Sequence, residues 1–244
     1  MPLLPEHLQS HLQELRRRVL IIFATILLCG AGAFFFAKPL AQLCMLPLFQ
    51  ADPELAGLVY THLTEAFIAY LKVSVLAGLA VAFPIILYQV WMFVAPGLFQ
   101  EEKAVFFRIV FWGGLLFLFG IVFSFVAIMP ELLSFFMEFH RENLEPKLKL
   151  GAYLTFVIRT CITFGLAFEI PFLMAAVGKT GLLTPVYFVK QRKYFYLAIL
   201  VLSFLLSAGE MLAAVLLAVP LFGLYELGIV IMRFFKPSGA SKSA

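Results

Sequence analysis

Residues 153–177 read YLTFVIRTCITFGLAFEIPFLMAAV, and this stretch decides the fold class. A helix needs roughly 20 mainly apolar residues to cross the hydrocarbon core of a bilayer. Tyr153–Val177 supplies them and carries only two charged side chains, Arg159 and Glu169. The stretch therefore predicts a membrane-spanning helix.

Glu169 is the unusual residue of this helix. By insertion scales, an acid near the centre of a spanning helix costs roughly 2.5–3.5 kcal/mol, so it is a candidate functional residue. Pro171 removes a backbone hydrogen bond and frees the carbonyl of Ala167, which predicts a kinked, polar notch beside the acid. Arg159 lies about 15 Å away along the helix axis and cannot pair with it. We expect Glu169 to meet water, a hydroxyl group or another helix, or to be protonated.

The rest of the chain has the same character. It is 63% hydrophobic and 13% charged, with a mean hydropathy of +1.02, whereas soluble domains are about 25% charged. We predict an all-α polytopic membrane protein, with residues 1–244 forming one integral membrane domain. Its six spans are expected at 19–37, 66–94, 105–129, 153–177, 194–207 and 211–232. The fifth and sixth look short, so that corner must thin the bilayer or lie behind other helices.

The positive charges predict the orientation. Cytoplasmic segments of membrane proteins are enriched in Lys and Arg. One side of the predicted spans carries Lys38, Arg141, Lys147 and Lys149. The other side carries Arg16, Arg17, Arg18, Lys103, Arg108, Lys179, Lys190, Arg192, Lys193, Arg233, Lys236 and Lys242. Both termini are therefore expected in the cytoplasm, as an arm over 1–18 and a tail over 233–244.

Several other classes of protein are disfavoured. The first span could be a cleavable signal peptide, but its apolar run continues past Ala33 through Phe36. The three cysteines lack metal or redox spacing, and the four histidines form no zinc motif. There is no Walker pattern and no basic stripe with interleaved aromatics, so neither nucleotide hydrolysis nor nucleic-acid binding is expected. We expect no cofactor, no metal and no enzymatic activity.

Two acidic features stand out on the predicted cytoplasmic side. Glu14 lies beside Arg16–Arg18 on the polar face of a short amphipathic helix, where it could simply neutralise an arginine. The connector 88–103 reads YQVWMFVAPGLFQEEK and contains Glu101 and Glu102. Capping of the next helix would explain both acids. Alternatively, they join Glu14 in an anionic patch walled by aromatics, which suits guanidinium groups because arginine bonds carboxylates bidentately.

Three stretches resemble the signature regions of the TatC family, the receptor component of the twin-arginine protein translocase. They are HLQELRRR at 11–18, the connector 88–103, and FGLAFEIP at 164–171. The resemblance runs the length of the chain. It implies a bacterial inner-membrane protein that binds the paired arginines of signal peptides on folded cargo. It also implies assembly with the single-span partners TatA and TatB, self-association, and transport driven by the proton-motive force.

The resemblance also assigns residues. It implies that Glu14 and Glu102 contact the twin arginines, with Phe93 in the same patch. The charge pattern described above, rather than the resemblance, adds Glu101 to the residues expected to bind the signal peptide. The other matching positions are Arg16 in the N-terminal motif, Pro47 in the first external loop and Glu169 as the buried acid of a concave groove.

One region departs from the family pattern. Residues 207–210 read SAGE where relatives usually carry a proline-and-aspartate motif, and Ala214 replaces a typical glutamine. This corner is implicated in docking the single-span partners. We expect Ser207 and Glu210 to take that role, with Glu210 in place of the aspartate.

The long segments Lys38–Glu65 and Pro130–Leu150 are expected to form an external cap with short helices, which leaves the spans splayed around a concave face containing Glu169. Three functions remain in view. A signal-peptide receptor ranks first. A proton-coupled small-solute transporter using Glu169 ranks second, because no inverted repeat is found. An intramembrane enzyme ranks last, since no nucleophile–base pair is present.

Overall fold

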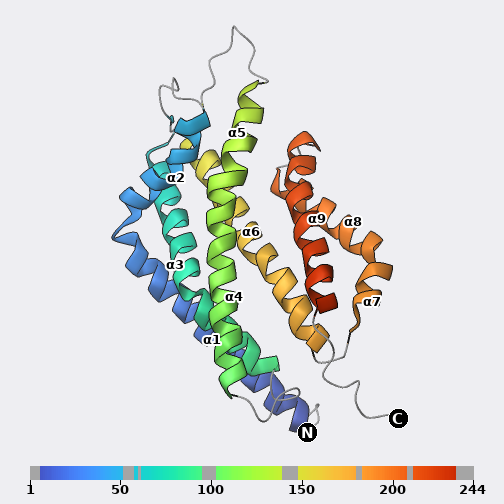
Figure 1. Cartoon of the computed structure of the whole chain (residues 1–244). Coiled ribbons are helices and arrows are strands. Elements are labelled where there is room, and N and C mark those ends of the chain that lie inside the picture. Colours follow the sequence, from blue (N-terminus) through green and yellow to red (C-terminus); the bar gives the residue numbers. More distant parts are fainter. Residues whose placement is uncertain are drawn as a thin grey trace, which may run out of the picture.

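The computed structural model describes residues 6–51, 58–59, 62–94, 103–138, 148–179, 183–207 and 211–234. Nearly all of these residues are helical (Figure 1). In the described ranges, the only β pairing is an isolated parallel bridge between Val59 and Lys149. The helices are α1 (Glu6–Phe34), α2 (Ala37–Ala51), α3 (Leu63–Val94), α4 (Lys103–Phe123), a π-helix (Ser124–Ile128), α5 (Met129–Glu138), α6 (Leu150–Lys179), α7 (Pro185–Lys190), α8 (Arg192–Leu206) and α9 (Met211–Phe234).

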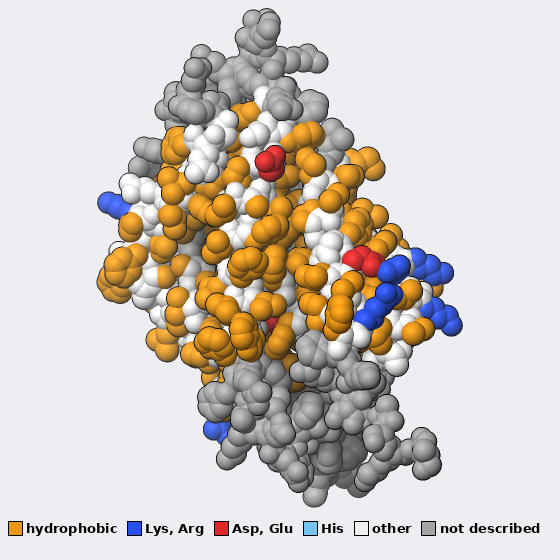
Figure 2. Space-filling model, in the orientation of Figure 1, with side chains coloured by type: hydrophobic (Ala, Val, Ile, Leu, Met, Phe, Trp, Pro, Cys, Tyr) orange, Lys and Arg blue, Asp and Glu red, His pale blue; other side chains and the backbone are white. Residues whose placement is uncertain are grey.

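Five of the helical segments are long and apolar enough to cross a membrane, namely Gln9–Phe34, Thr64–Phe93, Val110–Met137, Leu150–Gly178 and Ala214–Phe234. Apolar side chains cover most of the described surface in Figure 2. Phe23, Leu28 and Phe119, for example, are each more than half exposed. Such a surface suits lipid rather than water. The predicted all-α membrane fold is confirmed.

Two helices differ in length from the predicted spans. The fifth predicted span corresponds to the 15-residue α8, which is short and is not among the five candidate spans, whereas α9 has 24 residues. The helix of the third predicted span continues past residue 129. Helix α4 continues through the π-helix into α5 as one rod (Figure 1). Pro130 does not break this rod, because the π-helix directly before it changes the backbone hydrogen-bond pattern: the Met129 N–H donates to the Ser124 carbonyl, five residues back.

The helices form an open arrangement rather than a closed bundle. Helix α6 packs against α3 and α4 on one side and against α9 on the other. Helix α1 packs mainly along α3, and α8 packs along α9 (Figure 1). Because α1 and α8 lie at opposite margins, each leaves much of its surface to the surroundings.

Both long segments predicted to be external contain helices. Helices α2 and α5 pack against each other. The hydroxyl of Tyr153 donates a hydrogen bond to the Cys44 carbonyl at 2.7 Å and joins α6 to α2. The backbone N–H of Gly151 donates to the Glu65 carboxylate at 3.1 Å, so this acid lies in the first turn of α3 and also caps α6. Burial raises the pKa of the Cys44 thiol to about 11, which fits a packing role.

Glycines allow two helix pairs to approach at the backbone. A Cβ placed on Gly78 of α3 would collide with the backbone of Gly30 in α1. A Cβ on Gly120 of α4 would lie 2.5 Å from the carbonyl oxygen of Phe164 and 2.9 Å from the Cα of Gly165, both in α6. Small residues at helix crossings permit this close packing in membranes. The α1–α3 and α4–α6 pairs are therefore fixed by positions that accept no side chain.

Candidate functional site

The first part of the predicted site lies where the N-terminal part of α1 meets the C-terminal end of α3. Helix α1 is held there by stacking of His11 on Phe93, with ring centroids 4.5 Å apart and an interplanar angle of 21°. Glu14 and Arg18 lie on the same part of α1, and Gln89 lies one turn before Phe93. We call these five residues the Glu14 cluster.

The Glu14 carboxylate is already bonded by a guanidinium group of the same helix. Arg18 donates to Glu14 Oε1 through both Nε, at 3.1 Å, and Nη2. Its Nη1 also donates to Oε1 of Gln89 at 3.3 Å, which links α1 to α3. The Glu14 side chain is 37% exposed, while that of Arg18 is 16% exposed. The acid is therefore accessible, and its cationic partner is partly enclosed.

The structure brings together only part of the predicted site. Glu14 and Phe93 lie in one cluster, as expected. Arg16 is exposed on α1 and forms no ion pair within the described ranges. Glu101 and Glu102 lie outside the described residues. Sequence reasoning missed Arg18 as the specific partner of Glu14, although their i, i+4 spacing on a helix was a readable signal.

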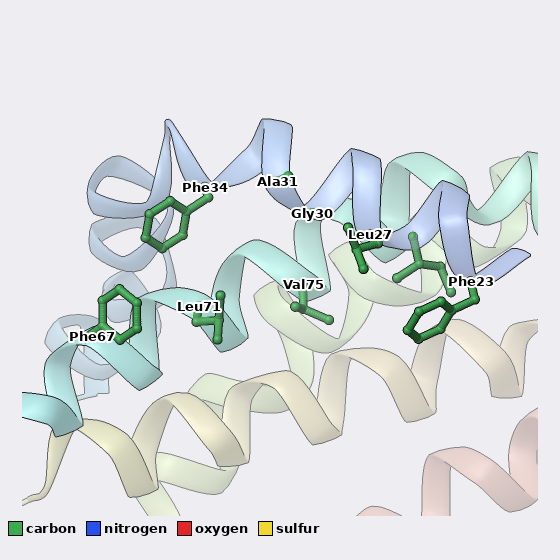
Figure 3. A pocket seen from close by; sticks show the side chains of 9 residues that line it. Phe23, Leu27, Gly30, Ala31, Phe34, Phe67, Leu71 and Val75 are labelled. Carbon is green, nitrogen blue, oxygen red and sulfur yellow. The ribbon is translucent and has the colours of Figure 1, made fainter.

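Further along α1, away from the Glu14 cluster, the contact between α1 and α3 is apolar. The two helices line an open pocket of about 550 Å³, shown in Figure 3 with the aromatic rings of Phe34 and Phe67 at one end and Phe23 at the other. No charged side chain lines it. The contact between α1 and α3 thus changes from a charged end at Glu14 to an apolar face further along α1.

Glu169 lies in the middle of α6 and is 4% exposed. Neither carboxylate oxygen has a hydrogen-bond partner among the described residues. A Cβ added to Gly113 of α4 would lie 3.2 Å from Glu169 Oε2. The acid is therefore packed against α4, and the absence of a side chain at Gly113 leaves room for it. Pro171 does not interrupt α6, and α9 approaches it closely, because a Cβ on Gly228 would lie 3.1 Å from the Pro171 Cα.

The remaining predicted residues lie elsewhere. Pro47 is buried within α2. Ser207 is buried at the end of α8, where its hydroxyl donates to the Phe204 carbonyl at 3.0 Å. Glu210 falls outside the described residues. Helix α8, which ends just before Ser207, packs along α9, whereas α1 packs mainly along α3, so Ser207 lies apart from the Glu14 cluster.

A second charged group, absent from the predicted site, joins α8 to α9. Arg192 Nη2 donates to Glu226 at 2.6 Å, and the hydroxyl of Tyr196 donates to the same carboxylate at 2.5 Å. Lys190 and Lys193 are exposed nearby in sequence. In Figure 2, basic side chains gather at the edge where α7 and α8 lie. For metals, the described part of the chain contains no group of three or more His, Cys, Asp or Glu that could hold an ion.

Known proteins share this sequence and fold. Residues 10–220 match the family model "Sec-independent protein translocase protein (TatC)". The Sec-independent protein translocase protein TatC of Listeria innocua is 36% identical over 93% of this chain and 91% of its own length. That of Helicobacter pylori is 31% identical over 96% of this chain and 90% of its own. A crystal structure of the twin-arginine translocase receptor TatC superposes with a TM-score of 0.84 at 33% identity, covering 92% of this chain and 98% of that one. The chain therefore belongs to the TatC family of Sec-independent protein translocase proteins.

Proposed function

We propose that this chain is the receptor subunit of a twin-arginine translocase and that it binds the paired arginines of signal peptides at the Glu14 cluster. The observation that carries the proposal is the Glu14 carboxylate, which is partly exposed and already bonded by a guanidinium group beside an aromatic ring. Two adjacent arginines need a second acid, and Glu102 is the proposed partner, with Glu101 beside it. Carboxylates bond guanidinium groups through short, charge-assisted hydrogen bonds.

The proposed topology has six spans, with both termini in the cytoplasm of a bacterium and the chain in its inner membrane. The Lys and Arg bias described above supports this orientation. The Glu14 cluster then faces the compartment in which folded cargo is made. A single chain of this size has no room for a pore that passes a folded protein, so we propose that it organises TatA- and TatB-type partners and further copies of itself. Transport would then be driven by the proton-motive force.

A proton-coupled solute transporter is the second candidate. The unpartnered carboxylate of Glu169 is the observation that favours it. The family relationship favours protein translocation, so we rank the transporter below the receptor.

Binding of a labelled signal peptide to the purified chain in nanodiscs tests the receptor proposal. We expect the twin-arginine peptide to bind more tightly than the same peptide with two lysines. Glu14→Ala and Glu102→Ala should each weaken binding by about tenfold, because an arginine loses its charged acceptor. Fluorescence anisotropy measures the dissociation constant of each peptide.

Glu131→Ala is the matched control, since this exposed acid lies in α5, at the other end of the rod from the start of α4. Equal binding of both peptides, unaffected by either Glu14→Ala or Glu102→Ala, would refute the receptor site and return attention to Glu169.

A further inference from the structure

We propose that Arg18 competes with the arginines of the signal peptide for the Glu14 carboxylate. In the unloaded protein it occupies Glu14, and an incoming guanidinium must displace it. Arg18 thereby lowers the apparent affinity of the site. This inference rests on the proposed binding of twin-arginine peptides at Glu14, and it names a residue that tunes the affinity by contacting the same carboxylate.

The bonding of Glu14 leaves an entry point for a ligand. Both Arg18 donors, Nε and Nη2, bond the same oxygen, Oε1. Neither of these bonds uses Oε2, and the Glu14 side chain is 37% exposed. A peptide guanidinium can therefore bond Oε2 first and displace Arg18 from Oε1 afterwards. The carboxylate is never left without a cationic partner during this exchange.

Gln89 gives the displaced arginine a place to remain. Arg18 Nη1 donates to Gln89 Oε1 at 3.3 Å, a bond that does not involve Glu14. The Arg18 side chain is only 16% exposed, so it is held between α1 and α3 rather than extended into solvent. An ordinary surface i, i+4 pair lacks such a second anchor on another helix. Arg18 can thus release Glu14 while it keeps its contact with α3.

Competition by Arg18 lowers the apparent affinity of every cationic peptide by the same factor, because that factor depends only on how often Arg18 bonds Glu14. Arginine presents a planar fork of donors that matches a carboxylate, whereas lysine offers a compact point charge. The preference for arginine over lysine therefore comes from the Glu14 carboxylate itself. A twin-arginine peptide replaces Arg18 with an equivalent group and adds a second arginine for another acid. Partly exposed ion pairs are weak, so competition should reduce the apparent affinity by about two- to fivefold.

The test compares Arg18→Gln with Arg17→Gln in the nanodisc binding assay. Arg17 is an exposed neighbour on α1 and forms no ion pair among the described residues. Both substitutions remove one positive charge, so both relieve the same long-range repulsion of a cationic peptide. Relative to Arg17→Gln, we expect Arg18→Gln to bind the twin-arginine peptide about two- to fivefold more tightly. The twin-lysine peptide should gain by the same factor, because an internal competitor reduces the affinity of both peptides equally.

Two outcomes would overturn the inference. If Arg18→Gln and Arg17→Gln bind each peptide with the same affinity, Arg18 does not compete for Glu14. If it weakens binding as Glu14→Ala does, Arg18 assists the ligand. The melting temperature of each variant, measured in the same nanodiscs, identifies a loss of binding that comes from misfolding. In that case Arg18→Lys, which keeps the charge but loses the fork, decides: an affinity for the twin-arginine peptide equal to that of the unsubstituted chain contradicts the inference. Failure of the receptor proposal looks different, because Glu14→Ala itself would then leave binding unchanged.

Discussion

Replacing Gly78 with alanine is expected to separate α1 from α3 and to lower the free energy of unfolding by about 2–4 kcal/mol. The added Cβ would collide with the backbone of Gly30 and would lie 2.9 Å from the carbonyl carbon of Cys29. Backbone atoms cannot rotate away as a side chain can, so the whole helix must move. Unfolding of the purified chain in a detergent titration, followed by tryptophan fluorescence, measures the loss.

Gly32→Ala and Gly223→Ala are the matched controls, because a Cβ at either position meets nothing within 4 Å. All three substitutions carry the same gain in helix propensity, about 1 kcal/mol at most. The Gly78 variant should also lose peptide binding, since Glu14 lies on α1 and Phe93 on α3. Unfolding of Gly78→Ala at the same detergent concentration as the controls would contradict the close crossing.

Replacing Glu169 with methionine is expected to stabilise the isolated chain by about 2 kcal/mol while protein export fails. The carboxylate is buried, and neither oxygen has a partner among the described residues. A buried polar group without hydrogen bonds costs roughly 1–3 kcal/mol. Methionine is unbranched and similar in length, so it fills the same space beside Gly113. The detergent titration measures stability, and export of a twin-arginine reporter in cells measures function.

Glu169→Gln serves as the matched variant, because it keeps the polar group and the shape but cannot ionise. A smaller stabilisation than that of methionine is expected. Glu131→Met removes an exposed acid from α5 and should leave stability within about 0.5 kcal/mol. Destabilisation by Glu169→Met would mean that the acid has a stabilising partner in the folded protein. Normal export by a stabilised variant would remove Glu169 from the proposed mechanism.

The sequence predicted the helices well because the bilayer imposes a length and a polarity that can be read directly. The run 153–177 lies within α6, and the short fifth segment is helical as α8. The helix of the third segment runs past residue 129 for a local reason. Pro130 marks the start of a loop in most contexts, but here the π-helix directly before it keeps the rod continuous.

The site was predicted less completely because its contacts join distant parts of the chain. Glu14 was recognisable as an acid among arginines, yet spacing alone did not indicate that Gln89 would hold the same arginine from another helix. Likewise, burial of Glu169 followed from its apolar neighbours. The room that Gly113 leaves for it depends on how α4 and α6 cross, which no single stretch of sequence reveals.

The position of α1 at the margin has a consequence for biogenesis. Only 6% of the most apolar window of this helix is buried within the protein, against 44% for α6. Because α1 is synthesised before α3, along which it mainly packs, we expect it to enter the bilayer as a solitary helix. Helices that insert independently and associate later need such a self-sufficient apolar surface. The exposed phenylalanines and leucines of α1 supply that surface.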